Sequence, residues 1–244
     1  MTLQDLCRCA AIALGCAGSV AAVAQPAPLW NGTQLSPDWT TVGLPASKGV
    51  PMPQFEPLSV DGQAALRIKS SAAYGHVLWA TTGPWNQTLQ WQWRVDQALT
   101  SADLRTRTGD DTAVRVCALF DVPLSELPFG QRVQMQLARS ISGQALPSAT
   151  VCYVWDDGAD TGAHITNAYS ERVRYWVLRG RGSATGEWYS ETRDLASDYL
   201  ALFGPRAQGA PPLIGLSVGA DSDNTQGQSL AWVRALQAAP QPRP

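Results

Sequence analysis

The sequence predicts an all-β protein, namely an antiparallel β-sandwich of jelly-roll type with one or two short helices. Short segments in which apolar and polar residues alternate recur along the chain, and a period of two is that of a half-buried strand. Turn dipeptides such as Asp61-Gly62, Asp157-Gly158 and Gly204-Pro205 separate them. With 21 Gly, 17 Pro and only 16% charged residues, the composition excludes a coiled coil.

The predicted strands follow one another at short intervals. In the segment 89–95, Leu89, Trp91, Trp93 and Val95 share one face, so both Trp side chains are expected in the core. The segment 114–120 is apolar on both faces, which is typical of a central strand. The other expected strands are 58–60 and 65–68, joined by an Asp-Gly hairpin, then 77–79, 151–155, 172–178, 213–218 and 230–236.

Two helical segments interrupt the strands. Asp194 is placed to cap a helix over 195–203, which Gly204-Pro205 ends, and a weaker helical pattern covers 129–139. The predicted organisation is a signal peptide (1–24), a Pro-rich extended segment that runs over the surface (25–57), one β-sandwich domain (58–238) and a tail (239–244).

The N-terminus has the pattern of a secretory signal. Residues 9–24 carry no charge, Arg8 is the basic residue before them, and Ala22-Val23-Ala24 offers small residues to a signal peptidase. The stretch is short and rich in Ala and Gly, so we expect export to the periplasm or medium and no membrane span in the mature chain. A lipid on Cys16 or a retained anchor are the alternatives.

Cleavage of the signal leaves two cysteines. Cys117 and Cys152 each lie in a predicted strand, so they can face each other across a sheet. An oxidising compartment favours a disulfide between them. Because Cys is often buried as a free thiol, the alternative of two unbonded cysteines stays open.

Several segments together resemble a bacterial protein family, the domain-of-unknown-function family 3047. They span most of residues 58–236 and are 91–93, 102–105, 109–111, 115–121, 151–155, Trp188 with 191–194, 198–199, 203–204 and 221–225. The resemblance implies no activity and no site residues. The overall pattern is also similar to the jelly-roll sandwiches of carbohydrate-binding modules, which is an analogy of fold and assigns no function.

A polar loop suggests a metal site. Asp221, Asp223 and Asn224 alternate closely enough to offer oxygen ligands to a hard cation, with calcium as the implied cofactor. The EF-hand pattern fails, because Gly227 comes one place late and Trp232 stands where Glu is required. The alternative is a loop whose Asp and Asn side chains form turns.

Two further groups are candidate ligand-binding residues. Trp155 precedes Asp156 and Asp157, and Trp188 lies in a Gly-rich turn, so either Trp is a candidate exposed aromatic, although large aromatics in sandwiches mostly fill cores. The second group is Asp110, Asp111 and Arg115, at the start of the expected central strand. They form either a buried ion-pair network, in which Arg105 or Arg107 could take part, or part of a cation or sugar site with Asp221 or Asp223.

These patterns favour a binding module over an enzyme. No nucleophile motif is present, there are two histidines, and none of the carboxylates Glu171, Glu187, Glu191 and Asp194 lies in a recognisable motif. A net charge of −2 without a Lys/Arg run excludes a nucleic-acid partner. We expect a non-catalytic sandwich that binds carbohydrate or another cell-envelope ligand; the alternatives are a structural or assembly domain of the envelope and a polysaccharide hydrolase or lyase.

Overall fold

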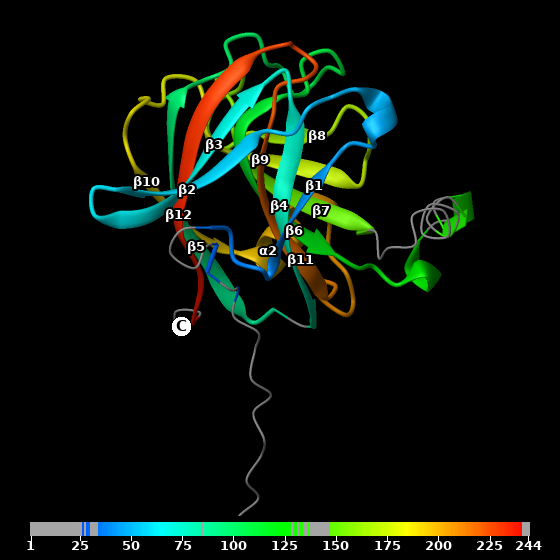
Figure 1. Cartoon of the computed structure of the whole chain (residues 1–244). Helices are drawn as coiled ribbons and strands as arrows, with labels where there is room; N and C mark the ends of the chain where they lie inside the picture. The colour runs from blue at the N-terminus through cyan, green and yellow to red at the C-terminus, as the bar shows by residue number, and fades with distance from the viewer. Residues whose placement is uncertain are drawn as a thin grey trace, which may run out of the picture.

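The computed structural model describes residues 26, 28–29, 34–83, 85–127, 129–130, 132–133, 136 and 147–240. Within them, twelve strands form two sheets that pack face to face (Figure 1). The predicted all-β sandwich is therefore confirmed, while its jelly-roll type stays a prediction. The predicted signal peptide, most of the segment 129–139 and residues 241–244 lie outside the described residues.

The larger sheet has seven strands, on the right of Figure 1. In spatial order they are β1 (Trp39–Gly43), β4 (Tyr74–Gly83), β11 (Leu213–Asp221), β6 (Thr112–Phe120), β7 (Ala149–Trp155), β9 (Val173–Arg179) and β8 (His164–Thr166). All neighbours are antiparallel except β7 and β9, which are parallel. The prediction of a purely antiparallel fold was wrong at this pair, because β8 lies at the edge and β9 returns between β8 and β7.

The smaller sheet has five strands, on the left of Figure 1. Their order is β10 (Tyr189–Asp194), β5 (Gln87–Gln97), β12 (Gln228–Pro240), β3 (Gln63–Ser71) and β2 (Gln54–Val60). The predicted hairpin joins β2 to β3, and its two turn residues, Asp61 and Gly62, have φ of 53° and 72°. Positive φ at both positions is the conformation for which Asp-Gly is favoured in two-residue turns.

The core lies between the sheets and follows the predicted alternation. Trp91 and Trp93 of β5 point inward, as predicted, and are fully buried. Their rings lie 5.6 Å apart edge to face, and they meet Tyr153 and Trp155 of β7 at 5.3 and 6.3 Å. Such aromatic pairs add to the free energy gained by burying their large apolar surfaces.

The predicted helix is α2 (Leu195–Phe203), at the lower end of the sandwich in Figure 1. Asp194 caps it, accepting hydrogen bonds from the backbone N–H groups of Ala196 and Ser197. Two short 3₁₀ helices, η1 (Ala46–Lys48) and η2 (Leu124–Glu126), lie in loops. No helix in the described part of the chain is long and apolar enough to cross a membrane.

The sandwich includes part of the N-terminal segment that was predicted to run over its surface. Trp39–Gly43 forms β1 against β4, and β2 starts at Gln54 rather than Leu58. The reason is local: Trp-Thr-Thr-Val is a β-favouring run between the prolines, and the Trp39 side chain is buried in the core.

Candidate functional site

Carboxylates from three places in the sequence meet at one end of the seven-stranded sheet. Asp111 precedes β6, Asp221 ends β11 and Asp223 follows in the next loop, and one carboxylate oxygen of each lies within 4.8 Å of the others. They meet because β6 and β11 are neighbours in the sheet. We call Asp111, Asp221 and Asp223 the carboxylate cluster.

Asp221 is the buried centre of this cluster, 4% exposed. Its Oδ2 accepts a hydrogen bond from Arg115 Nη1 at 3.2 Å, while its Oδ1 has no hydrogen-bond partner among the described residues. Burial raises the pKa of Asp221 to about 9; Arg115 opposes this shift, and Asp223 and Asp111 add to it. An anionic cluster in this arrangement has a strong tendency to bind a proton or a cation.

Asp110 and Asp111 are oriented by separate partners. Asp110 accepts hydrogen bonds from Tyr175 Oη at 2.8 Å and Asn167 Nδ2 at 2.6 Å, and burial raises its pKa. Asp111 accepts from the backbone N–H and hydroxyl of Thr225 at 2.7 and 2.6 Å, and from Asn224. Asp111 therefore fastens the loop after β11 to the start of β6.

The sequence grouped Asp221, Asp223 and Asn224 as metal ligands, and the structure arranges these three differently. The Oδ1 of Asn224 accepts a hydrogen bond from Tyr169 Oη at 3.0 Å, and its Nδ2 donates to Asp111. Asn224 thus supports the cluster, and Asp111 takes the place expected for it. Arg115 pairs with Asp221, whereas the hydrogen bonds of Asp110 come from Tyr175 and Asn167.

Of the two alternatives for Trp155, an exposed aromatic or a core residue, the structure shows the core residue. Its ring is 1% exposed and packs edge to face on Trp93 and Tyr189, because the inner face of β7 lies against the smaller sheet. Asp156 is buried and accepts from Gly158 N–H, and Asp157 accepts from Trp155 Nε1 at 3.3 Å. Burial raises the pKa of both carboxyls, and their contacts shape a turn.

Cys117 and Cys152 form a disulfide in this structure, with an S–S distance of 2.07 Å. They are register partners on β6 and β7. Both are buried in a second, smaller apolar cluster with Leu104, Tyr175 and Val177, separate from the core between the sheets.

Trp188 belongs to a row of side chains on the outer face of the five-stranded sheet. The guanidinium carbon of Arg94 lies 5.7 Å from the ring centre of Trp188 and 5.8 Å from that of Trp232. The guanidinium carbon of Arg67, on the neighbouring strand β3, lies 5.9 Å from the ring centre of Trp232. We call Trp188, Arg94, Trp232 and Arg67 the Trp–Arg row; Arg234 stacks on Trp188 at 3.8 Å.

Carboxylates fix the row in place. Asp96 accepts two hydrogen bonds from Arg94, at 2.6 and 2.9 Å, and one from Trp232 Nε1 at 2.8 Å. Arg67 pairs with Glu56. The row is therefore a surface of planar groups whose guanidiniums are paired with carboxylates, and Trp232 is only 9% exposed.

A polar hollow of about 300 Å³ lies beside the Trp–Arg row. The register places Gln54, Lys69, Leu230 and Gln97 in the next cross-strand row, along β2, β3, β12 and β5, on the face that carries the Trp–Arg row. Most of its lining residues have polar side chains, although Ser70 and Ser229 are themselves buried. The lining consists of Gln54, Lys69, Ser70, Ser71, Gln97, Gln228, Ser229 and Leu230.

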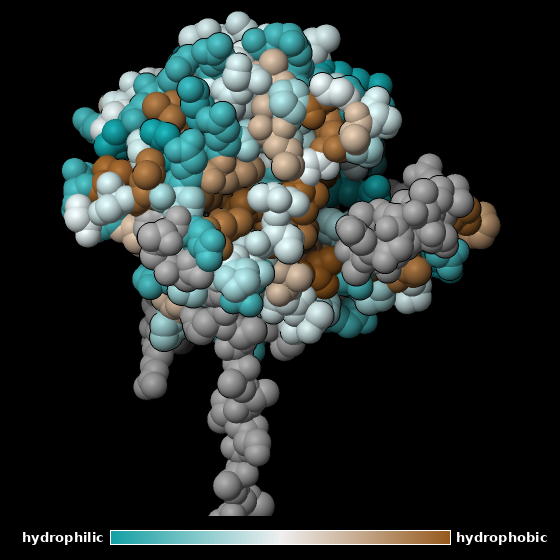
Figure 2. All heavy atoms as spheres, in the orientation of Figure 1, coloured by the Kyte–Doolittle hydropathy of each residue, from teal (hydrophilic) through white to brown (hydrophobic). Residues whose placement is uncertain are grey.

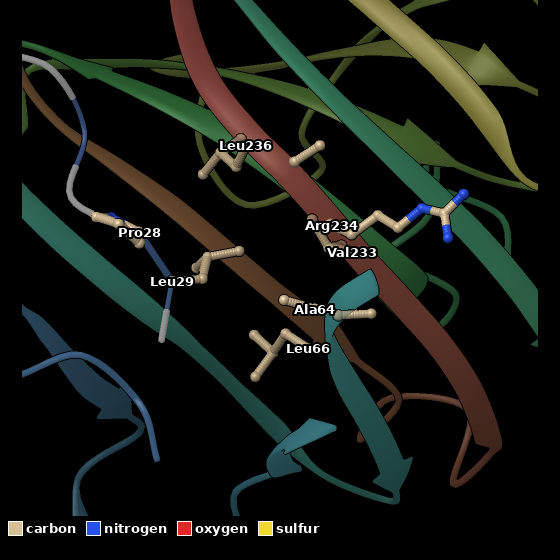
Figure 3. A pocket seen from close by; sticks show the side chains of 9 residues that line it. Pro28, Leu29, Ala64, Leu66, Val233, Arg234 and Leu236 are labelled. Atoms are coloured by element: carbon tan, nitrogen blue, oxygen red, sulfur yellow. The ribbon is translucent and has the colours of Figure 1, made fainter. Parts of the chain in front are cut away.

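A second hollow, of about 200 Å³, is apolar and lies where β3 separates from β12 (Figure 3). Pro28 and Leu29 form one wall, opposite Leu66, Val233 and Leu236. The guanidinium of Arg234 points away from these side chains (Figure 3). Figure 2 shows hydrophobic residues gathered in the middle of this face of the molecule, with mostly hydrophilic residues above them. The apolar hollow offers few groups that could bind a hydroxylated ligand.

Comparison with protein-family models matches residues 37–237 to the family DUF3047, described as a protein of unknown function. The chain belongs to the DUF3047 family. The match starts close to β1 and ends within β12, so the DUF3047 region and the sandwich coincide. No curated protein matches the chain.

Sequence reasoning missed the Trp–Arg row of this DUF3047 protein. Trp232 and Arg234 alternate with Ala231 and Val233, which face the core, so the period of two already places both on the outer face. Gln90, Gln92 and Arg94 alternate in the same way on β5. The sequence does not reveal that β5 and β12 are neighbours, so the row itself could not be inferred.

Proposed function

We propose that this protein is a non-catalytic binding module of the cell envelope, and that it binds carbohydrate on the outer face of the five-stranded sheet. The observation that carries the proposal is the polar hollow beside the Trp–Arg row. A sugar presents several hydroxyl groups, each a donor and an acceptor, so a site for it needs convergent polar groups.

The lining of the hollow fits this requirement. The side-chain amides of Gln54, Gln97 and Gln228 are exposed and each offers both donors and an acceptor. Lys69 adds a cation, which favours a sugar that carries a carboxylate or phosphate. The adjoining Trp–Arg row adds planar groups with fixed orientation, which lowers the entropy cost of binding.

The carboxylates of this face favour binding over hydrolysis. A glycosidase of the usual kind needs a carboxyl group with a raised pKa as its general acid. Hydrogen bonds from Arg94 and Trp232 lower the pKa of Asp96, which keeps this carboxylate ionised. Glu56 is paired with Arg67.

Localisation in the envelope is part of the proposal. The predicted signal at residues 1–24 supports export, and a disulfide persists in an oxidising compartment. Both features suit a protein that meets polysaccharides outside the cytoplasm.

Isothermal titration calorimetry of the purified protein against soluble polysaccharides, both neutral glucans and polymers of uronic acids, tests the proposal. We expect binding by the wild type and at least tenfold weaker binding by a Gln54→Ala/Gln228→Ala variant. Gln63→Ala, which removes an exposed amide of β3 outside the hollow, is the matched control and should bind as the wild type does.

The same samples distinguish the alternatives. Release of reducing ends from a bound polysaccharide would indicate a hydrolase, and formation of unsaturated products a lyase. If no polysaccharide binds at millimolar sugar, the proposal is wrong and a structural or assembly role is favoured.

A further inference from the structure

Two buried oxygen atoms on neighbouring strands at this end of the seven-stranded sheet lack partners. Asp221 Oδ1 and Thr112 Oγ1 are inaccessible to solvent and have no hydrogen-bond partner among the described residues. The two residues are 4% and 1% exposed. Buried polar atoms are almost always satisfied by protein, water or an ion, so two such atoms together point to a ligand.

The register explains how Thr112 reaches the same place as Asp221. Gly219 pairs with Arg115 and Asp221 pairs with Thr112, so β6 has one more residue than β11 over this interval. Ala113 and Val114 both join the core at this bulge. The bulge thereby returns Thr112 to the outer face, opposite Asp221.

A divalent cation balances the charge of the cluster once its three carboxyls are ionised. Asp111, Asp221 and Asp223 carry three formal negative charges when ionised, and Arg115 is the cation that contacts them, through Asp221. Two negative charges remain, which equals the charge of one divalent cation. Burying unbalanced charge is costly, and a bound cation removes that cost.

We infer that Asp111, Asp221 and Asp223 bind one Ca²⁺ ion, with the hydroxyl of Thr112 facing the same site. Ca²⁺ takes oxygen ligands at about 2.3–2.6 Å, so oxygens bound to one ion lie at most about 5 Å apart. The three carboxylate oxygens lie within 4.8 Å of one another and satisfy this condition.

The proposed site is accessible to solvent at Asp223, and its carboxylate at Asp111 is held by hydrogen bonds. Asp223 is half-buried, which gives an ion and its remaining water ligands access. Asp111 is held by Thr225 and Asn224, so its orientation is fixed before an ion binds. An ion there would join the start of β6, the end of β11 and the following loop, and would stabilise the folded chain.

Calcium titration of the purified protein, stripped with EDTA and dialysed, tests this inference. Calorimetry should give one Ca²⁺ per chain, and the thermal midpoint should rise by about 5–10 °C at a Ca²⁺ concentration 100 times the dissociation constant. Asp223→Asn keeps the shape of the side chain and should weaken Ca²⁺ binding at least tenfold. Asp160→Asn, at an exposed carboxylate outside the cluster, should respond as the wild type does.

Three results would overturn the inference. They are a wild type that shows neither heat nor midpoint shift up to 10 mM Ca²⁺, an Asp223→Asn variant that binds Ca²⁺ as tightly as the wild type, and a response to Mg²⁺ without one to Ca²⁺. The wild-type titration decides on its own if the variant does not fold.

Discussion

Removal of the Cys117–Cys152 disulfide should destabilise the protein by about 4 kcal/mol. The two cysteines are separated by 35 positions in the sequence. In the chain-entropy account, a bridge that closes a loop of about 35 residues removes about 13 cal/mol/K from the unfolded state, which is about 4 kcal/mol at 25 °C. For a chain of this size, that corresponds to a fall in the thermal midpoint of about 8–15 °C.

Guanidinium unfolding followed by Trp fluorescence measures this difference, because Trp91 and Trp93 are buried and report on the core. The oxidised protein is compared with a Cys117→Ala/Cys152→Ala variant and with wild type that was reduced while unfolded and then refolded. Reduced wild type keeps both sulfur atoms, so it separates the loss of the bridge from any cavity left by Ala.

The reasoning predicts that both comparisons give a similar loss and that reductant has no effect on the Ala variant. A loss below about 1 kcal/mol for both would refute it, because the bridge would then constrain little of the unfolded chain. A large loss in the Ala variant alone would assign the effect to packing in the smaller apolar cluster.

Burial, together with Arg115, lowers the pKa of His76 to about 4, so the unfolded chain binds this proton first as pH falls. The contribution of His76 to the free energy of unfolding should be at its maximum above about pH 6.5 and should fall by about 3 kcal/mol down to pH 4. A His76→Gln variant whose free energy of unfolding depends on pH as that of the wild type does would contradict this. The Arg193 guanidinium donates hydrogen bonds to both carboxylate oxygens of Asp198. Asp198→Asn removes the negative charge from this pair and should lower the free energy of unfolding in denaturant by about 3 kcal/mol. Gly219→Ala places a Cβ 2.3 Å from a backbone oxygen of β4 and should lower the thermal midpoint by several degrees, whereas Gly130→Ala, in open space, should leave it unchanged.

The sequence predicts the strands well where one local pattern decides their burial. The alternation in 89–95 correctly assigns Trp91 and Trp93 to the core, and the Asp194 cap correctly starts α2. Local pattern is enough there because a strand face or a helix cap depends on residues close in sequence.

The errors arise where burial depends on distant strands. Trp155 is a candidate exposed aromatic in the sequence because Asp156 and Asp157 follow it, but the neighbours of β7 in the sheet and the β5 side chains across the core bury it. β1 was missed because prolines surround it, although its partner β4 supplies the hydrogen bonds and the core contact for Trp39. Neither partner is visible in a single sequence.

The carboxylate cluster also depends on contacts between distant strands. The sequence offers a joint site of Asp110 or Asp111 with Asp221 or Asp223 as one of two alternatives, but these groups lie far apart along the chain and nothing in the sequence shows that they meet. Their meeting depends on a sheet order in which β6 and β11 are neighbours, and on a bulge that displaces the register at Ala113 and Val114. A strand without that extra residue would turn Thr112 into the core and carry Asp111 away from Asp221. The bulge is therefore the feature that determines whether these side chains form a site, and deletion of Ala113 should abolish calcium binding even in a variant that still folds.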